Sequence, residues 1–286
     1  MKVIKIDKFF GYCPGLKHSL RMAFELAEEA ERERKKVYYD VPLAHNEDVA
    51  NSLKERGFIE IVPDEKSDGE GNYFLISAHG ASDSKAEWLE SKNFVVRSAI
   101  CPTVKRVQEL AKRDYSDGYQ VVIFGKNDHA EIQGVAGCVD DQALIVDSVA
   151  QAKKIRLVGK ASVICQTTFS SEDFQNFCDT LKKSNPDREI IIRNTVCPIV
   201  EGRIKSIRRY IEENKPDIAV VVGSKTSSNT RQLADELREI LPTMMIGNAD
   251  EIQHKNLKSV SSVIVVSGTS APPEVVEAVA SRIESL

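Results

Sequence analysis

Three cysteine–proline pairs divide the sequence at nearly even intervals. The first and second cysteines are 88 positions apart and the second and third 96, at Cys13-Pro14, Cys101-Pro102 and Cys197-Pro198. Each pair follows a run of strand-forming residues, and proline suits the first position of a helix because its φ is fixed. We therefore expect three similar strand–Cys–Pro–helix corners that bring their thiols to one point. Three thiols brought together can bind zinc or an iron–sulfur cluster.

The spacing of these cysteines favours an iron–sulfur cluster over zinc. Structural zinc sites usually draw thiolates from close C-x-x-C pairs, and the sequence contains no such pair. Three thiolates suit a [4Fe–4S] cluster and leave one iron without a protein ligand, and that iron can act as a Lewis acid on a substrate oxygen. The alternative is that the three cysteines simply fill the core. We interpret Cys138, Cys165 and Cys178 as core residues.

A second set of chemically active residues follows the predicted strands. The set comprises His45, His79, His129, Glu131, Thr167, Ser227, Ser228, Asn229 and Ser270. Imidazolium, hydroxyl and amide groups, together with backbone N–H groups at strand ends, bind phosphate oxygens well. Glu131 would be the proton donor of the same cavity. The alternatives are structural histidines, a surface carboxylate at Glu131 and ordinary turn residues at Ser227–Asn229. The sequence has no G-x-x-x-x-G-K-[ST] or G-x-G-x-x-G motif, so a nucleotide is not indicated.

Strands and helices are expected to alternate along the whole chain. Helices are predicted at Lys17–Lys35, from the residues after Glu47 to about Lys54, at Pro102–Lys112, at Pro198–Glu212 and after Pro272. Strands are predicted at Val3–Ile6, Val37–Val41, Tyr73–Ser77, Phe94–Arg97, Gln120–Phe124, Ser162–Cys165, Glu189–Arg193, Ile218–Val222 and Ser262–Val266.

The polar loops recur at similar offsets from each cysteine. The first loop follows its cysteine after 32, 28 and 30 residues, and the second after 66, 66 and 73. Alternating strands and helices predict parallel sheets, whose ligands bind beyond the carboxyl ends of the strands. We therefore predict an α/β fold of three small units, at residues 1–100, 101–196 and 197–286, around a shared central cavity with the Cys-Pro corners at its floor.

Composition narrows the class of protein. The 286 residues are 42% hydrophobic and 29% charged, as in ordinary globular proteins. The net charge of -4 gives no electrostatic support for a nucleic-acid partner. No apolar run approaches the roughly 18 residues of a membrane span, and the N-terminus does not read as a signal peptide. We expect a cytoplasmic protein whose cysteines stay reduced rather than forming disulfides.

These residues together resemble the LytB family of 4-hydroxy-3-methylbut-2-enyl diphosphate reductases, which act in non-mevalonate isoprenoid synthesis. The resemblance runs over essentially the whole chain. It is carried in order by Tyr12–Gly15, Ala44–Glu47, Ser77–Gly80, Cys101–Val104, His129–Glu131, Gln166–Thr168, Asn194–Cys197, Val222–Asn229 and Ser270–Pro272.

The resemblance implies a fold and a site. The fold would be a pseudo-threefold trefoil of the three units around a [4Fe–4S] cluster, with a [3Fe–4S] form as isolated being the alternative. The cluster ligands would be Cys13, Cys101 and Cys197. Glu131 would feed protons, and Thr167 would order a water molecule or the substrate hydroxyl. The diphosphate would be held by His45, His79, Ser227, Asn229 and Ser270, with His129 and Ser228 beside it.

The resemblance also implies an activity. The family removes the allylic hydroxyl of its substrate with two electrons and two protons, which gives isopentenyl and dimethylallyl diphosphates. The electrons would come from a ferredoxin or flavodoxin. The chain departs from the usual family pattern at Pro14, Ala130 and Thr226, and it has Gln108 where histidine is common. The alternatives are therefore a paralogous [4Fe–4S] reductase of another small substrate, a non-redox hydro-lyase, or a non-catalytic metal- or thiol-based binder.

Overall fold

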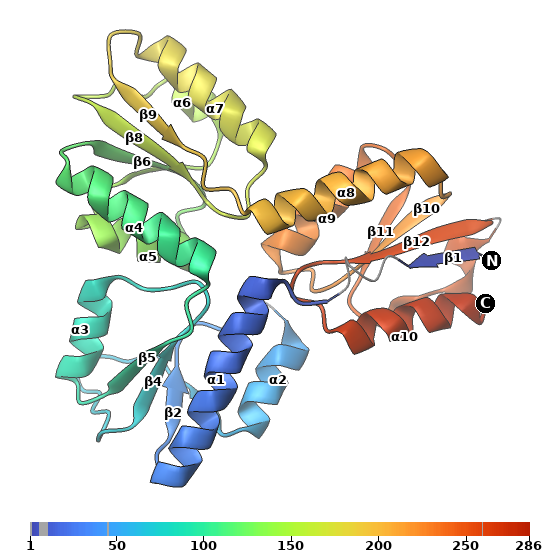
Figure 1. Ribbon diagram of the computed structural model, residues 1–286, viewed down its shortest axis with the longest axis horizontal. Helices are drawn as coiled ribbons and strands as arrows, with labels where there is room; N and C mark the ends of the chain where they lie inside the picture. Colours follow the sequence, from blue (N-terminus) through green and yellow to red (C-terminus); the bar gives the residue numbers. More distant parts are fainter. Residues whose placement is uncertain (1, 6–10, 45, 259) are drawn as a thin grey trace. The chain divides into compact units, whose positions relative to one another are not determined.

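The structure is a computed structural model that describes residues 2–5, 11–44, 46–258 and 260–286. In this part of the chain the strands form three four-stranded sheets, and all neighbouring strands are parallel (Figure 1). The strands are β1 (Lys2–Lys5), β2 (Val37–Tyr39), β3 (Phe58–Glu60), β4 (Tyr73–Ile76), β5 (Val95–Ser98), β6 (Gln120–Phe124), β7 (Leu144–Val146), β8 (Ala161–Cys165), β9 (Ile190–Arg193), β10 (Ile218–Val222), β11 (Thr243–Ile246) and β12 (Ser262–Ser267). The predicted α/β class is confirmed.

Helices separate most of these strands. The α-helices are α1 (Pro14–Glu33), α2 (Glu47–Glu55), α3 (Asp83–Ser91), α4 (Pro102–Ser116), α5 (Ala130–Ala136), α6 (Val149–Ala152), α7 (Ser171–Ser184), α8 (Pro198–Asn214), α9 (Ser228–Arg238) and α10 (Pro273–Glu284). Short 3-10 helices occur at η2 (Gly137–Val139), η3 (Ala249–Glu251) and η4 (His254–Leu257). Among these described helices, none combines the length and the apolar character needed to span a membrane.

The chain divides into two compact units, each described by itself below. The first unit comprises Met1–Lys17, Ala44–Ser52 and Pro198–Leu286, and it holds the sheet with the order β1-β12-β10-β11. The second unit comprises His18–Leu43 and Leu53–Cys197, and it holds the sheets β3-β2-β4-β5 and β7-β6-β8-β9.

All three sheets share one strand order. We number the strands of each sheet in the order β2, β3, β4, β5; β6, β7, β8, β9; and β10, β11, β12, β1. In each sheet the first strand has the second on one side and the third on the other, and the fourth lies beyond the third. In the first unit the first three strands are β10, β11 and β12, and the fourth is β1. The order therefore reverses between β2 and β4, between β6 and β8, and between β10 and β12. Ligands of open parallel sheets bind at the carboxyl ends of the strands at such switch points.

The N-terminal strand completes the last sheet rather than the first. Lys2–Lys5 pairs with β12 in register, from Lys2 opposite Ser262 to Lys5 opposite Val265. The predicted unit 1–100 includes this strand, and the sequence gives no local sign of its partner because strand pairing is a tertiary contact. The remaining predicted boundaries stay a prediction.

Each Cys-Pro pair lies where the chain leaves one sheet for the next. Pro14, Pro102 and Pro198 are the first residues of α1, α4 and α8. These helices follow β1, β5 and β9, the fourth strands of the three sheets, and they lead to β2, β6 and β10, the first strands. The predicted strand–Cys–Pro–helix order is confirmed.

The sheet β7-β6-β8-β9 is covered on both faces, which explains its unbroken apolar strands. On one face Val122 and Phe124 of β6 pack in a buried cluster with side chains of α6 and α7, including Phe177. On the other face Val121 and Ile123 pack with side chains of α4, α5 and η2. Neighbouring residues of a strand point to opposite faces, so every residue of β6 from Val121 onward is buried.

A buried ion pair joins α4 to β9 within the second unit. The carboxylate of Asp114 accepts hydrogen bonds from Arg193 Nε and Nη2, both at 2.9 Å, and from Ser162 Oγ at 2.6 Å. Its side chain is 1% exposed, whereas that of Arg193 is 34% exposed. Burial raises the pKa of Asp114, but the hydrogen bonds from Arg193 and Ser162 outweigh burial and leave the pKa below its ordinary value.

We expect Asp114→Asn to lower the free energy of unfolding by about 2–3 kcal/mol, because it leaves a half-buried guanidinium without its counter-charge. A carboxyl whose pKa is lowered by folding stabilises the protein above its ordinary pKa of 3.8. The difference between wild type and variant should therefore shrink as the pH falls through and below that value. Urea unfolding at several pH values measures this. Asp235→Asn, which breaks the exposed pair with Arg238, should change stability by less than about 0.5 kcal/mol.

Candidate functional site

The switch point between β6 and β8 brings together the predicted proton donor, Glu131, and Thr167. Glu131 is the second residue of α5, which follows β6, and Thr167 follows β8. The backbone N–H of Thr167 donates to Glu131 Oε1 and its hydroxyl donates to Glu131 Oε2, both at 2.7 Å. The side chain of Glu131 is 2% exposed. The interpretation of Glu131 as a surface carboxylate is therefore excluded.

The environment of Glu131 favours its protonated form. Burial raises the pKa of this carboxyl, and the two hydrogen bonds from Thr167 only partly oppose the shift. A carboxylic acid that keeps its proton at higher pH can act as a general acid. Because the Thr167 hydroxyl donates to Glu131, its lone pairs are left to accept a hydrogen bond from a water molecule or a ligand hydroxyl.

Two of the predicted histidines lie side by side in the second unit. The rings of His79 and His129 meet edge to face, with centroids 5.6 Å apart. His129 caps α5, and its Nδ1 accepts the Glu131 N–H at 3.2 Å, so a neutral His129 ring carries its proton on Nε2. His79 Nδ1 lies 3.3 Å from Ser77 Oγ. His79, His129, Glu131 and Thr167 are thus joined through the loops that follow β4, β6 and β8.

The first unit gathers hydroxyl groups at its own switch point. Ser227 caps α9 and accepts the N–H of Thr230 at 3.4 Å, and Ser270 Oγ donates to Ser227 Oγ at 3.4 Å. Ser227 and Ser270 are buried, and Ser228 is the first residue of α9. Within the described residues Asn229 Oδ1 is buried without a hydrogen-bond partner. Because an unpaired buried oxygen is costly, this atom would be stabilised by a ligand or water O–H group that donates to it, while the amide nitrogen is the group that can donate to an anion.

Two glycines let α9 approach the ends of β10 and β12. A Cβ atom on Gly268 would lie 2.1 Å from Thr230 Oγ1, 3.0 Å from Thr230 Cβ and 3.3 Å from Thr230 Cα. A Cβ atom on Gly223 would lie 2.7 Å from Thr230 Oγ1, and Gly223 also has a φ of +151°. The fully buried Thr230 therefore packs directly on the strand ends and sets the distance between these ends and the first turn of α9.

We expect Gly268→Ala to displace the first turn of α9 and to cost about 1–3 kcal/mol of stability through overpacking. The affinity of this variant for inorganic pyrophosphate should also fall, because the Ser227 and Ser270 hydroxyls move apart. Equilibrium unfolding and calorimetric titration measure the two effects. Gly202→Ala is the control, because nothing lies within 4 Å of the added atom in α8. If Gly268→Ala and Gly202→Ala have the same stability and the same affinity for pyrophosphate, the close packing of Thr230 on Gly268 does not position the Ser227 and Ser270 hydroxyls.

The same backbone hydrogen bond ties each candidate cysteine to the loop after the third strand of its sheet. Cys13 N–H donates to Thr269 O at 3.1 Å, in the first unit. In the second unit Cys101 N–H donates to Ala78 O at 3.0 Å, and Cys197 N–H donates to Thr167 O at 2.8 Å. The acceptors either precede Ser270 and His79 directly or belong to Thr167 itself. The backbone of every candidate cysteine is thus hydrogen-bonded either to a predicted site residue, Thr167, or to the residue directly before one.

The donor chemistry of these three cysteines fits an iron–sulfur cluster. Cys13, Cys101 and Cys197 are partly exposed and precede the first residue of a helix, where the helix dipole favours the negative charge of a thiolate. Cys13 Sγ also accepts the N–H of Leu16 at 3.3 Å. All six cysteines carry thiols rather than disulfides.

The other three cysteines are poor candidates for ligands. Burial raises the pKa of Cys138 to about 11 and that of Cys178 to about 12, and it also raises the pKa of Cys165. Cys165 and Cys178 lie in the apolar cluster beside α7. Their interpretation as core residues is confirmed, whereas Cys138 is partly exposed and donates to Gly134 O.

The candidate ligands are divided between the two units, because Cys13 belongs to the first and Cys101 and Cys197 to the second. Among the described residues no three His, Cys, Asp or Glu side chains form a group that could hold a metal ion. The convergence of the three sulfurs therefore stays a prediction. The predicted substrate residue His45 lies outside the described residues.

Two positions at these sites were not assigned from the sequence. Gln166 is fully buried, its Oε1 accepts the Lys126 N–H at 2.9 Å, and its Nε2 donates to Thr168 Oγ1 at 2.9 Å. It thereby joins the loops after β6 and β8. Ser267 Oγ accepts the Gly11 N–H at 3.0 Å beside the Cys13 corner. Each is a polar residue at the end of an apolar strand, and Gln166 also belongs to one of the segments that carry the family resemblance, but neither signal assigns a role.

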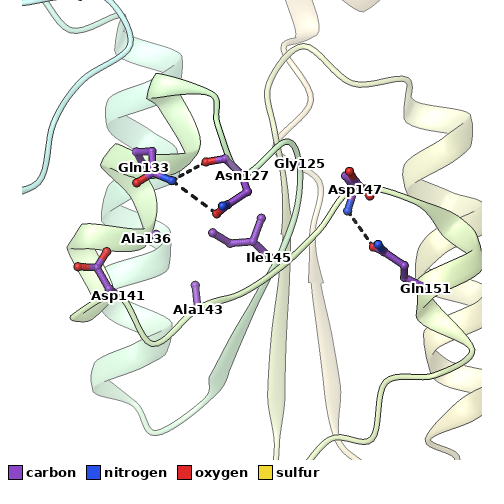
Figure 2. Close-up of a pocket in the computed structure, with 9 residues that line it drawn as sticks. All are labelled: Gly125, Asn127, Gln133, Ala136, Asp141, Ala143, Ile145, Asp147 and Gln151. Carbon is purple, nitrogen blue, oxygen red and sulfur yellow. Dashed lines mark hydrogen bonds between the residues drawn. The ribbon is translucent and has the colours of Figure 1, made fainter. Parts of the chain in front are cut away.

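A cavity of about 570 Å³ lies elsewhere, at the carboxyl ends of β6 and β7 (Figure 2). Its lining includes two carboxylates, Asp141 and Asp147, and three amide side chains, those of Asn127, Gln133 and Gln151. Gln133 Nε2 donates to Asn127 O, and the Asp147 N–H donates to Gln151 Oε1 at 3.3 Å. The two carboxylates would repel a diphosphate, and none of the predicted site residues lines this cavity.

Comparisons with known proteins extend the sequence resemblance. A family model described as LytB protein matches residues 4–284. The 4-hydroxy-3-methylbut-2-enyl diphosphate reductase of Dictyoglomus thermophilum is 34% identical over 288 residues, which cover 99% of this chain and 97% of that protein. The enzyme of the same name from Caldanaerobacter subterraneus subsp. tengcongensis is 31% identical over 286 residues, with coverages of 99% and 97%.

Two solved structures are similar over nearly the whole chain. One is a structure of (E)-4-hydroxy-3-methyl-but-2-enyl diphosphate reductase, the terminal enzyme of the non-mevalonate pathway. It is 30% identical with a TM-score of 0.69, and all of both chains is covered. The reductase structure from Plasmodium falciparum has a TM-score of 0.85 at 24% identity, covering 96% of this chain and 86% of that one, and it supports the fold alone.

Proposed function

The chain belongs to the LytB family, and from this premise we propose that it is a 4-hydroxy-3-methylbut-2-enyl diphosphate reductase of non-mevalonate isoprenoid synthesis. Relatives of that name match almost its full length at about 30% identity. The reaction breaks the allylic C–O bond of the substrate, forms one C–H bond and releases water. Two electrons and two protons balance it, and the products are isopentenyl and dimethylallyl diphosphate.

One observation of the structure supports this function more than any other. Each of the three cysteine corners is hydrogen-bonded to a loop that carries a predicted substrate or acid residue, with N···O distances of 2.8 to 3.1 Å. The backbone of each cysteine is therefore held beside Ser270 in the first unit and beside His79 and Thr167 in the second. A reductase needs its electron source and its substrate groups to be held in such a relation.

In this proposal Cys13, Cys101 and Cys197 hold a [4Fe–4S] cluster. When bound, the cluster would supply the electrons and an iron atom that can act as a Lewis acid. The three thiols at helix starts suit this role, because thiolates are the ligands of such clusters.

The anion-binding residues come from both units. In the first unit Ser227, Ser228, Asn229 and Ser270 offer hydroxyl and amide donors beside the N-terminus of α9, whose dipole favours negative charge. In the second unit His79 and His129 offer ring N–H groups. His45 is proposed as a further ligand of the diphosphate.

Glu131 and Thr167 would deliver protons. Burial keeps the proton on Glu131 to a higher pH than usual, and the Thr167 hydroxyl lies 2.7 Å from Glu131 Oε2. For a proton to pass outward, the protonated carboxyl group would donate to Thr167 Oγ while the Thr167 hydroxyl turns to donate to the leaving oxygen, which reverses the hydrogen bond between the two residues. Protonation of the leaving hydroxyl makes water the leaving group, and water leaves more easily than a hydroxide ion does.

The electrons would come from a ferredoxin or flavodoxin. The sequence has no nicotinamide or flavin motif that could supply them within the chain. A cytoplasmic location, as predicted from the sequence, would keep the cysteines reduced until the cluster is inserted.

The function is tested by anaerobic purification followed by an assay with dithionite and 4-hydroxy-3-methylbut-2-enyl diphosphate. We expect bound iron and sulfide, and formation of both products only when the reductant is present. Turnover without a reductant would indicate a hydro-lyase instead. An iron-loaded protein that leaves this substrate unchanged and reduces another would make it a paralogue.

A further inference from the structure

Arg203 of α8 binds two segments of the first unit at once. Its Nη1 donates to Gly11 O at 3.2 Å, to Ser267 O at 3.3 Å and to Gly268 O at 3.4 Å. Its Nη2 donates a second hydrogen bond to Gly11 O at 3.3 Å. Gly11 follows β1 along the chain, whereas Ser267 ends β12 and Gly268 follows it, so the guanidinium joins the two neighbouring strands at their carboxyl ends.

These two segments carry a candidate cluster ligand and a candidate substrate ligand. Gly11 lies two residues before Cys13, and Gly268 lies two residues before Ser270. The Gly11 backbone has a φ of +71° and leaves no room for a side chain, because a Cβ atom would lie 2.6 Å from Pro273. Only glycine therefore fits this position, and Arg203 joins the Gly11 carbonyl to the segment that leads to Ser270.

The charge of Arg203 has no protein carboxylate to balance it among the described ion pairs. Its hydrogen-bond partners are neutral carbonyl groups, and the guanidinium interacts electrostatically with Cys13. Other arginines of the same helix differ: Arg208 pairs with Glu236, and Arg209 pairs with Glu213. A partly buried cation beside Cys13 lowers the free energy of negative charge at this point.

We propose that Arg203 is a positioning residue that holds the Cys13 corner against the Ser270 loop and supplies a positive charge that stabilises the reduced cluster. The inference rests on the proposed function, because it needs a cluster at Cys13. Reduction adds negative charge to a cluster, so a fixed cation raises its reduction potential. The carbonyl contacts are a separate effect, since they set the position of Ser270 relative to Cys13.

Two substitutions separate charge from position. Arg203→Gln keeps an N–H donor but removes the charge, and Arg203→Lys keeps the charge but loses the planar fork that reaches three carbonyl groups. We expect Arg203→Gln to shift the electron-transfer equilibrium of the cluster at least tenfold towards the oxidised form, about 59 mV for one electron. We expect Arg203→Lys to keep the potential nearly unchanged and to raise KM for the diphosphate at least fivefold.

The measurements are a redox titration of the anaerobically purified full-length protein and its steady-state kinetics. Arg209→Gln is the matched control, because Arg209 lies on the same helix with a side chain that is 81% exposed, and it should leave both quantities unchanged. Suppose that the wild-type protein binds a cluster, but Arg203→Gln leaves the potential unchanged and Arg203→Lys leaves KM unchanged. The inference about Arg203 is then wrong, and the proposed function is unaffected. A wild-type protein that binds no cluster overturns the proposed function and this inference with it. If Arg203→Gln does not fold, an unchanged KM in Arg203→Lys still overturns the positioning role.

Discussion

Replacing Cys101 by serine is expected to lower the reductase activity by more than about 100-fold and to release iron from the protein. Even substitutions beyond the ligands of a metal site cost 10–100-fold, and here a ligand itself is lost. A serine hydroxyl does not ionise as a thiol does, so it cannot replace the thiolate. Bound iron, sulfide and dithionite-dependent activity are measured on the anaerobically purified variant.

The matched control is Cys138→Ser. Cys138 is also partly exposed, but its thiol donates to Gly134 O, and burial raises its pKa to about 11. A hydroxyl can keep that hydrogen bond, so iron content and activity should stay at the wild-type level. Equal loss of iron in Cys138→Ser and Cys101→Ser would remove the basis for choosing the three Cys-Pro cysteines as ligands.

Glu131→Gln is expected to lower kcat by about 10²–10⁴-fold, because the amide cannot supply the proton that the leaving hydroxyl needs. Binding of the diphosphate should change much less, since the Glu131 carboxyl group bonds to Thr167, and the bond to His129 comes from the Glu131 backbone N–H, which the substitution keeps. Steady-state kinetics with dithionite separates kcat from KM. Glu172→Gln is the matched control, because Glu172 is also the second residue of a helix, α7, but is exposed.

The same variant has a second expected result in stability. Folding raises the pKa of Glu131, so the protonated carboxyl stabilises the fold at low pH. This contribution is lost as the pH rises above the ordinary value of 4.5 and through the pKa of the folded protein. Glu131→Gln has no such dependence and should gain stability relative to wild type as the pH rises above 4.5. A normal kcat in a well-folded Glu131→Gln would contradict the role of Glu131 as the acid.

Local sequence patterns predicted the buried strands and the corners well. Gln120–Phe124 and Ile218–Val222 have the predicted bounds, because they are apolar runs covered on both faces. The three prolines open their helices as expected, since a fixed φ and a missing N–H are local properties. The repeated offsets of the polar loops reflect the common strand order of the three sheets.

Features that depend on tertiary contacts were not predicted. The strands β3, β7 and β11 are edge strands of three or four residues with partly exposed side chains, so they lack a strong apolar signal. The pairing of β1 with β12 joins the two ends of the chain. Arg203 contacts Gly11, 192 positions away, and Gln166 contacts Lys126, 40 positions away. No local pattern encodes such bonds.

The central claim is that Cys13, Cys101 and Cys197 hold one and the same cluster, and thiol protection tests it most directly. The anaerobically purified protein is treated with iodoacetamide before and after removal of iron with a chelator, and alkylation of each cysteine is measured by mass spectrometry. We predict that these three thiols are protected together in the loaded protein and become reactive together once the iron is removed. Modification of any one of them in the loaded protein, at the rate seen after iron removal, would contradict the claim.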